Sequence, residues 1–231
     1  MKFSTNAILS LGLLFTLAVS SCKKDDDTET TTPETGTSFI SIVNASPGLA
    51  TYNYYMNDVK VNAAALPLGG TVPYAQVNAG TYATKFTSAS TTESLLSKSI
   101  NLSSTGVYTY FLTGKVGELE GILAKDEIAG VGTQVAVRLV NLSPDAPALD
   151  LVVKDGATVI TNQFYKGVSA FVAMEPKTYT LTVVDKSNGS VKATLTDVVF
   201  GAGKYYSVLV RGMVKPSETE HPLGAQLIVN L

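Results

Sequence analysis

The chain has 231 residues, of which 45% are hydrophobic and 16% are charged, a composition typical of packed domains rather than of a wholly disordered chain. Its formal net charge is −2 and it contains no block of Lys or Arg, which argues against nucleic acid as a partner. The single cysteine, Cys22, excludes an internal disulfide framework and any cysteine-based zinc site.

The first predicted element is an export signal over residues 1–21. Lys2 supplies a positive charge, and residues 7–19 form an uncharged, mostly apolar run that is too short to cross a bilayer as a helix. The run ends in Val19-Ser-Ser-Cys22, which resembles the lipobox of bacterial lipoproteins. The resemblance implies that Cys22 carries lipid such as palmitate, and that several acyl chains together anchor the protein to a membrane. The alternative is an ordinary secretory signal with an incidental cysteine.

Residues 22–37 are predicted to form a disordered, solvated tether, because they are rich in Thr and charged residues and have no apolar period. The tether begins with Lys23, Lys24, Asp25, Asp26 and Asp27. This run resembles the signals that direct lipoproteins of Bacteroidetes-type bacteria to the outer face of the outer membrane. We therefore expect a lipid-anchored protein of the cell outer membrane that is exposed at the surface. A periplasm-facing protein with an acidic linker is the alternative.

The rest of the chain contains an internal repeat. Ile42-Val-Asn-Ala-Ser-Pro47 and Leu139-Val-Asn-Leu-Ser-Pro144 lie 97 positions apart. Other pairs share this offset: Asp58 with Asp155, Thr81-Tyr82 with Thr178-Tyr179, Gly106-Val-Tyr108 with Gly203-Lys-Tyr205, and Leu112 with Leu209. Near the C-terminus the offset grows by about seven residues, which predicts an inserted loop at residues 215–221. The repeat predicts two modules, residues 38–126 and 134–231, which touch or hinge through a short join.

Within each module, apolar and polar residues alternate with a period of two, which is typical of half-buried strands. In residues 178–184, for example, Tyr179, Leu181 and Val183 alternate with threonines. We therefore predict an all-β fold, two tandem immunoglobulin-like, Greek-key β-sandwiches. Tyr108 and Tyr205 are interpreted as tyrosine corners, with a binding role as the alternative. Residues 205–210 are apolar on both faces, which suits a central strand or contact with the other module.

A family resemblance is carried by residues 135–156. Six of them, Ser143, Pro144, Asp145, Ala146, Pro147 and Asp150, match a pattern common at the start of a bacterial family, domain of unknown function 4397. The resemblance implies a β-sandwich in an exported protein and brings no reaction with it. Asn141 stands where that family usually has histidine, which argues against a metal-binding or catalytic imidazole. The first module is a diverged copy, in which Gly48 and Asn53 stand in place of Asp145 and Asp150.

Two sets of residues are candidate binding sites. Asp145, Asp150 and Asp155 are weak candidates for Ca²⁺, but their spacing fits no EF-hand loop and turn chemistry explains them better. Tyr55 is expected on an outward strand face and, with Tyr74, is a candidate aromatic platform for a sugar ring or a protein partner. No cofactor is indicated.

No catalytic residue is predicted. The only histidine, His221, lies in the inserted loop, and no Gly-x-Ser-x-Gly elbow occurs. The expected function is non-catalytic binding or adhesion at the outer-membrane surface, with an unidentified protein or glycan as partner. The alternatives are a structural or assembly component of an envelope protein complex and, further, a hydrolase of envelope or extracellular glycans.

Overall fold

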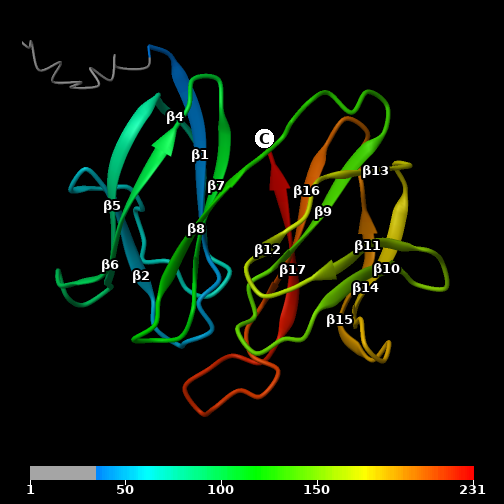
Figure 1. Cartoon of the computed structure of the whole chain (residues 1–231). Coiled ribbons are helices and arrows are strands. Elements are labelled where there is room, and N and C mark those ends of the chain that lie inside the picture. The colour runs from blue at the N-terminus through cyan, green and yellow to red at the C-terminus, as the bar shows by residue number, and fades with distance from the viewer. Residues whose placement is uncertain (1–34) are drawn as a thin grey trace, which may run out of the picture. The chain divides into compact units, whose positions relative to one another are not determined.

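The computed structural model describes residues 35–231, and all of the regular secondary structure in that range is β-strand (Figure 1). No helix in this range is long and apolar enough to span a bilayer. The strands before residue 130 are β1 (Thr37–Asn44), β2 (Tyr52–Met56), β3 (Val59–Lys60), β4 (Thr71–Asn78), β5 (Gly80–Ser88), β6 (Ser94–Leu102), β7 (Val107–Thr113) and β8 (Glu120–Lys125). Those after it are β9 (Val135–Asn141), β10 (Leu149–Val153), β11 (Thr158–Gln163), β12 (Gly167–Val168), β13 (Val172–Met174), β14 (Thr178–Asp185), β15 (Val191–Val199), β16 (Tyr205–Arg211) and β17 (Gly224–Asn230).

The two groups of strands form two sandwiches with the same connectivity. In the first sandwich, the sheet β4-β1-β7-β8 packs on the sheet β3-β2-β5-β6. In the second, β12-β9-β16-β17, with β13 also on β9, packs on β11-β10-β14-β15. In both, the first strand runs parallel to a late strand, β1 beside β7 and β9 beside β16, whereas the other pairs are antiparallel. The all-β sandwich prediction is confirmed.

The alternation in the sequence places the core side chains as expected. In β14, Tyr179, Leu181 and Val183 are buried while the threonines between them are more exposed. The first sandwich fills the matching space with rings, since Tyr54 and Phe86 lie with centroids 4.8 Å apart. Rings in contact with tilted planes combine apolar burial with favourable quadrupole contacts. The two copies therefore keep one pattern of inward positions with different side chains.

The predicted match between the two copies is wrong by one residue in β7 and β16. Leu112 pairs with Asn44, and the residue that pairs with the equivalent Asn141 is Val210 rather than Leu209. The tyrosine corner of the first sandwich is Tyr108, whose hydroxyl accepts a hydrogen bond from the Ser103 amide at 3.2 Å. In the second sandwich the equivalent bond, 3.1 Å long, runs from the Gly201 amide to Tyr206 and not to Tyr205. The shift arises in β15: Tyr82 pairs with Ile100 in the first copy, whereas its counterpart Tyr179 pairs with Val198 because a β-bulge adds one residue to β15. The repeat offset therefore changes from 97 to 98 within that strand. Tyr205 consequently faces away from the core and packs edge-on against Phe171.

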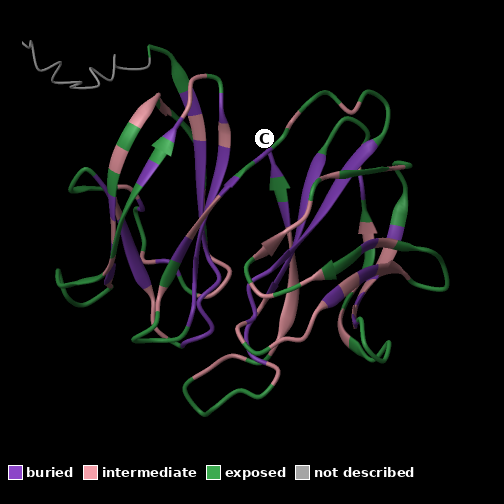
Figure 2. Cartoon of the chain, viewed as in Figure 1, coloured by how far each residue is buried: buried purple, intermediate pink, exposed green. Residues whose placement is uncertain are grey.

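A third apolar cluster joins the two sandwiches. It contains Val43, Ala45, Phe111 and Ala124 of the first sandwich and Val140, Leu142, Leu209 and Ile228 of the second. The β4-β1-β7-β8 and β12-β9-β16-β17 sheets thus pack face to face, as the buried strands at the centre of Figure 2 show. This explains why β16 is apolar on both faces: Val208 and Val210 fill its own core, while Leu209 contacts the first sandwich.

Candidate functional site

Several predicted site residues lie outside the part of the chain that the structure describes. These are Cys22 and the charged residues that follow it, Lys24, Asp25, Asp26 and Asp27. The remaining candidates, Tyr55, Tyr74 and the three aspartates, all lie on described strands or loops.

The three aspartates do not converge. Asp150 Oδ1 accepts hydrogen bonds from the Thr161 hydroxyl and the Asn162 amide at 2.9 and 2.7 Å. Asp155 occupies the β10–β11 turn with a left-handed backbone (φ 57°), as an Asp-Gly turn requires. Within residues 35–231, no group of three or more His, Cys, Asp or Glu side chains is arranged to hold a metal ion. The geometry gives Asp150 and Asp155 local roles in turns and strand edges.

Asp145 has a different role: it holds the inserted loop. Its two carboxylate oxygens accept hydrogen bonds from the amides of Val214 and Lys215 at 2.8 and 2.9 Å. These amides begin the segment 214–221 between β16 and β17, which we call the clasp. Two adjacent N–H donors on one carboxylate are charge-assisted hydrogen bonds, stronger than neutral ones. The start of the clasp is therefore fixed to the second sandwich.

The end of the clasp is fixed to the first sandwich. The His221 amide donates to the Pro47 carbonyl at 2.8 Å, and the Leu49 amide donates to the Thr219 carbonyl at 3.1 Å. Gly48 and Glu220 form an isolated β-bridge, and Glu220 lies 3.4 Å from the Lys115 ammonium group. The clasp is the loop at the foot of Figure 1, opposite the start of β1.

This arrangement explains a difference between the two copies. Gly48 and Asp145 are equivalent in the repeat, and both contact the clasp, one through its backbone and the other through its carboxylate. A Cβ atom at Gly48 would lie 3.0 Å from Cγ2 of Val116, closer than nearly all ordinary contacts. An aspartate at position 48 would therefore displace the Val116 side chain by a few tenths of an ångström, beside the segment that receives the clasp.

Tyr55 lies on the outward face of the β3-β2-β5-β6 sheet, beside a shallow groove. It pairs across the strands with Lys85, whose ammonium group lies 5.0 Å from the centre of the Tyr55 ring and 3.0 Å from Asp58 Oδ1. The groove, of about 330 Å³, is lined by Asp58, Ala83, Thr84, Lys85, Ser97, Lys98 and Ser99. Ala83 pairs with Ser99 across β5 and β6, and these small side chains leave the centre of the groove low, while Lys85, paired with Ser97, borders it.

The second sandwich has a groove at the equivalent place, of about 490 Å³. Asp155, Thr180, Thr182, Thr194 and Thr196 line it at the positions that correspond to Asp58, Ala83, Lys85, Ser97 and Ser99. Val152, the counterpart of Tyr55, lines it too. Because the inner sheets pack on each other, these two grooves lie on the outermost sheets. Both copies thus have a groove on the same outward sheet face.

Tyr74 does not join Tyr55 in an aromatic platform, because it lies on β4 in the other sheet. Its hydroxyl donates to Asp126 Oδ2 at 2.6 Å and accepts from Asn230 Nδ2 at 2.8 Å. Burial, and then the nearby Asp126 carboxylate, raise the pKa of the Tyr74 phenol well above its usual value. Tyr74 is therefore a neutral hydrogen-bonding group between the sandwiches.

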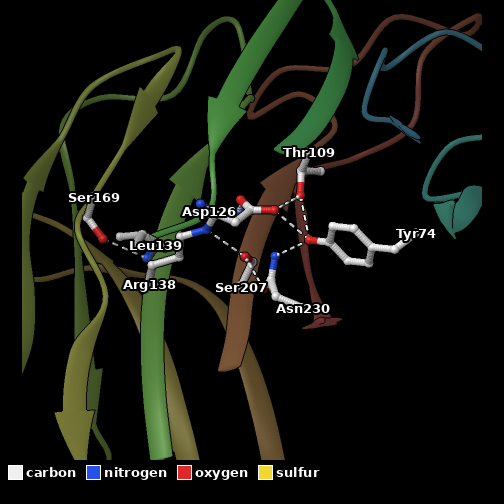
Figure 3. Close-up of polar contacts among 8 residues, drawn as sticks. All are labelled: Tyr74, Thr109, Asp126, Arg138, Leu139, Ser169, Ser207 and Asn230. Atoms are coloured by element: carbon white, nitrogen blue, oxygen red, sulfur yellow. Dashed lines mark hydrogen bonds and ion pairs between the residues drawn. The ribbon is translucent and has the colours of Figure 1, made fainter. Parts of the chain in front are cut away.

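Tyr74 belongs to a buried polar network that the sequence analysis missed (Figure 3). At its centre, Arg138 and Asp126 face each other at 2.5 Å, with side chains 1% and 0% exposed. The contact is an ion pair rather than an aligned hydrogen bond, and no other partner satisfies the two facing atoms. Ser207 accepts from Arg138 Nε at 2.7 Å, and the Phe171 ring lies 4.6 Å from the guanidinium carbon. The one sequence feature that could have indicated this network is Arg138, a charged residue within the otherwise mostly apolar strand β9.

Comparison with solved structures gives similarities at 10% sequence identity. The TIE protein of Bacillus anthracis has a TM-score of 0.25, with 76% of this chain and 34% of that chain covered, so this chain spans about a third of it. A family CBM26 module of Eubacterium rectale Amy13K, solved with maltoheptaose, has a TM-score of 0.25, with 84% of this chain and 95% of that chain covered. A putative polysaccharide-binding protein (DUF1812) of Bacteroides thetaiotaomicron has a TM-score of 0.22, with 84% of this chain and 96% of that chain covered.

No curated protein matches this chain in sequence. A family model does match part of it, from β1 of the first sandwich through most of β10 in the second. Residues 38–152, just under half of the chain, match the family described as domain of unknown function (DUF4397), and the resemblance predicted from the sequence is confirmed over this segment.

Proposed function

We propose that this chain is a non-catalytic binding protein of the bacterial cell envelope, held in the outer membrane by lipid on Cys22. Its ligand is a hydroxyl-rich polymer of the glycan class, bound along the outward face of the β3-β2-β5-β6 sheet. The observation that carries the proposal is the recurrence of a groove at equivalent residues of both copies.

The side chains around the first groove suit a sugar ring. Tyr55 offers an apolar ring beside the groove, on which the C–H face of a sugar can pack. Asp58, Lys85 and Ser99 offer an acceptor, a donor and a hydroxyl that can do either. The open shape favours a polymer that runs across the sheet over a small molecule that needs enclosure.

The same groove lacks the arrangement that glycoside hydrolysis requires. Hydrolases flank the scissile bond with two carboxyl groups, about 5 to 10 Å apart. The first groove is lined by one carboxylate, Asp58, which is paired with Lys85, and the second groove is likewise lined by one, Asp155. This supports binding without catalysis at these faces.

A glycan array tests the proposal with the chain lacking residues 1–22. We expect binding to a subset of glycans, reduced at least about tenfold in Tyr55→Ala and retained in Tyr55→Phe, which keeps the ring. Lys204→Ala removes an exposed lysine from a turn of the second sandwich and should leave binding unchanged. Binding to no glycan, or equal binding by Tyr55→Ala, would reject the proposed surface.

The membrane anchor is tested separately in cells. Replacing Cys22 by Ser removes the thiol that accepts lipid, so the protein should move from the outer-membrane fraction to a soluble one. Metabolic labelling with a palmitate analogue should mark the wild-type chain alone. Labelling of the Cys22→Ser chain would contradict the anchor.

A second candidate function, as a component that binds another envelope protein, is favoured by the surface at the clasp. It uses different residues from the grooves.

A further inference from the structure

The clasp completes a pocket at one end of the described structure. Two loops of the first sandwich and the clasp border an open hollow of about 410 Å³, lined by Gly48, Leu49, Ala50, Lys115, Val116, Thr219 and Glu220. We call this the tip pocket. Leu49 and Val116 are 57% and 66% exposed, although most large apolar side chains of the described chain are buried. Exposed aliphatic side chains that gather around a hollow mark interaction sites more often than single ones do.

The polar groups of the tip pocket already have partners. Glu220 Oε1 faces the Lys115 ammonium group at 3.4 Å, and Glu220 Oε2 accepts a hydrogen bond from the Ser217 amide at 3.0 Å. The Thr219 carbonyl accepts from the Leu49 amide. What the pocket leaves unmatched is therefore aliphatic surface, and no aromatic ring lines it for stacking on a sugar.

The two segments that form the rim of the pocket, residues 114–119 and the clasp, each carry an acid without an ion-pair partner among the described residues. Glu118 lies on the same loop as Val116, and Glu218 lies on the clasp; both are exposed and neither forms an ion pair within residues 35–231. Lys215 is the exposed cation on the clasp, so these three side chains sum to one negative charge. A partner that complements this rim carries positive charge beside its apolar group.

The tip pocket also lies away from the point at which the chain enters the sandwich. β1 begins at Thr37 and ends at Asn44, and the pocket residues Gly48, Leu49 and Ala50 follow it directly. At about 3.3 Å per residue, β1 separates the two ends by roughly 25 Å. The pocket and the start of β1 therefore lie at opposite ends of that strand.

We propose that the tip pocket is a docking site for a protein partner that inserts one aliphatic side chain between Leu49 and Val116 and places a basic residue beside Glu118 and Glu218. The aliphatic side chain would pack on the exposed apolar surface of Leu49 and Val116, and the basic residue would complement the negative charge of Glu118 and Glu218. This inference goes beyond glycan binding at the sheet faces and does not depend on it, because the two surfaces share no residue.

A random-peptide phage library tests the proposal with the chain lacking residues 1–22. We expect enrichment of peptides in which an aliphatic residue lies within two positions of Lys or Arg. A synthetic peptide with that motif should bind at least about tenfold more weakly to the Leu49→Ser/Val116→Ser variant. These side chains are exposed, so the variant should keep the wild-type melting temperature, and Tyr55→Ala should bind the peptide normally.

The charge requirement has its own test. Glu118→Lys/Glu218→Lys should shift the enriched peptides from basic to acidic flanking residues, and 0.5 M NaCl should weaken the wild-type preference, because exposed charges are screened by salt. The proposal is overturned if no motif is enriched, if the same motif is enriched on Leu49→Ser/Val116→Ser, or if the charge reversal changes nothing. A dimer in sedimentation that the Leu49→Ser/Val116→Ser variant abolishes would assign the pocket to a second copy of this chain instead.

Discussion

Replacing Asp126 by Leu should destabilise the two packed sandwiches more than replacing Arg138 by Met. Asp126→Leu leaves a guanidinium group at 1% exposure with Ser207 and Phe171 as its remaining partners, and it removes the acceptor of Tyr74 and Thr109. Removing one partner of a buried ion pair costs about 3–5 kcal/mol, since the charge left behind is uncompensated. A guanidinium group cannot lose its proton to relieve this cost.

Arg138→Met is the milder change for two reasons. The Met side chain can still pack on Phe171, and Asp126 keeps hydrogen bonds from the Thr109 and Tyr74 hydroxyls at 2.7 and 2.6 Å. We expect a loss of about 2 kcal/mol, the cost of one charge-assisted interaction. The double variant should lie closer to the wild type than the sum of the single losses predicts, because two apolar side chains can replace a buried pair at little cost.

Urea unfolding followed by tyrosine fluorescence measures these values, as the chain has no tryptophan. With a denaturant slope of about 3 kcal/mol per M, Asp126→Leu should lower the midpoint by about 1–2 M. Both sandwiches should unfold in one transition, because the network and the third apolar cluster join them. Equal losses in the two single variants, or strictly additive losses in the double variant, would refute the reasoning.

Three further predictions concern single side chains. Tyr54→Phe removes a buried hydroxyl that has no hydrogen-bond partner, so the free energy of unfolding should stay the same or rise by up to about 1 kcal/mol; a clear loss would reveal a partner. Tyr206→Phe should lower the free energy of unfolding by about 1 kcal/mol and Tyr205→Phe should leave it almost unchanged. The opposite order in urea unfolding would show that Tyr205 is the tyrosine corner. Hydrogen bonds from Ser217, and then the Lys115 charge, lower the pKa of Glu220 below its usual value, so its hold on the clasp exists at neutral pH and is lost as pH falls through that lowered pKa. Hydrogen exchange at the Leu49 and His221 amides, corrected for intrinsic rates, should therefore speed up as the pH falls below the ordinary glutamate pKa in the wild type but not in Glu220→Gln.

Sequence patterns predicted what depends on local spacing. The alternation in residues 178–184 predicted a half-buried strand, and the same faces are buried in the structure. The repeat also predicted the outward position of Tyr55 through its counterpart Val152. The tyrosine-corner prediction failed because Gly203-Lys-Tyr205 resembles Gly106-Val-Tyr108 in sequence, while a bulge in β15 adds one residue to the second copy and makes Tyr206 the equivalent of Tyr108.

Contacts between distant residues were not predictable from the pattern. Asp126 directly follows β8 and Arg138 lies in a strand that is otherwise mostly apolar, and nothing in their spacing shows that they meet. Tyr74 was a candidate for an aromatic platform with Tyr55, but its hydroxyl accepts a hydrogen bond from Asn230 of the other sandwich. Asp145 looked like turn chemistry or a metal ligand, and it instead binds amides almost seventy positions away.

The clasp has a consequence for how the two copies can diverge. In a simple duplication either copy can replace the other. Here the second copy supplies the clasp, and the first copy supplies the residues that bind it, Pro47, Gly48 and Leu49. A side chain at Gly48 that crowds Val116, or a shorter segment 214–221, alters the match between them. The two halves are thus committed to complementary parts, and selection on this protein acts on the pair rather than on either module.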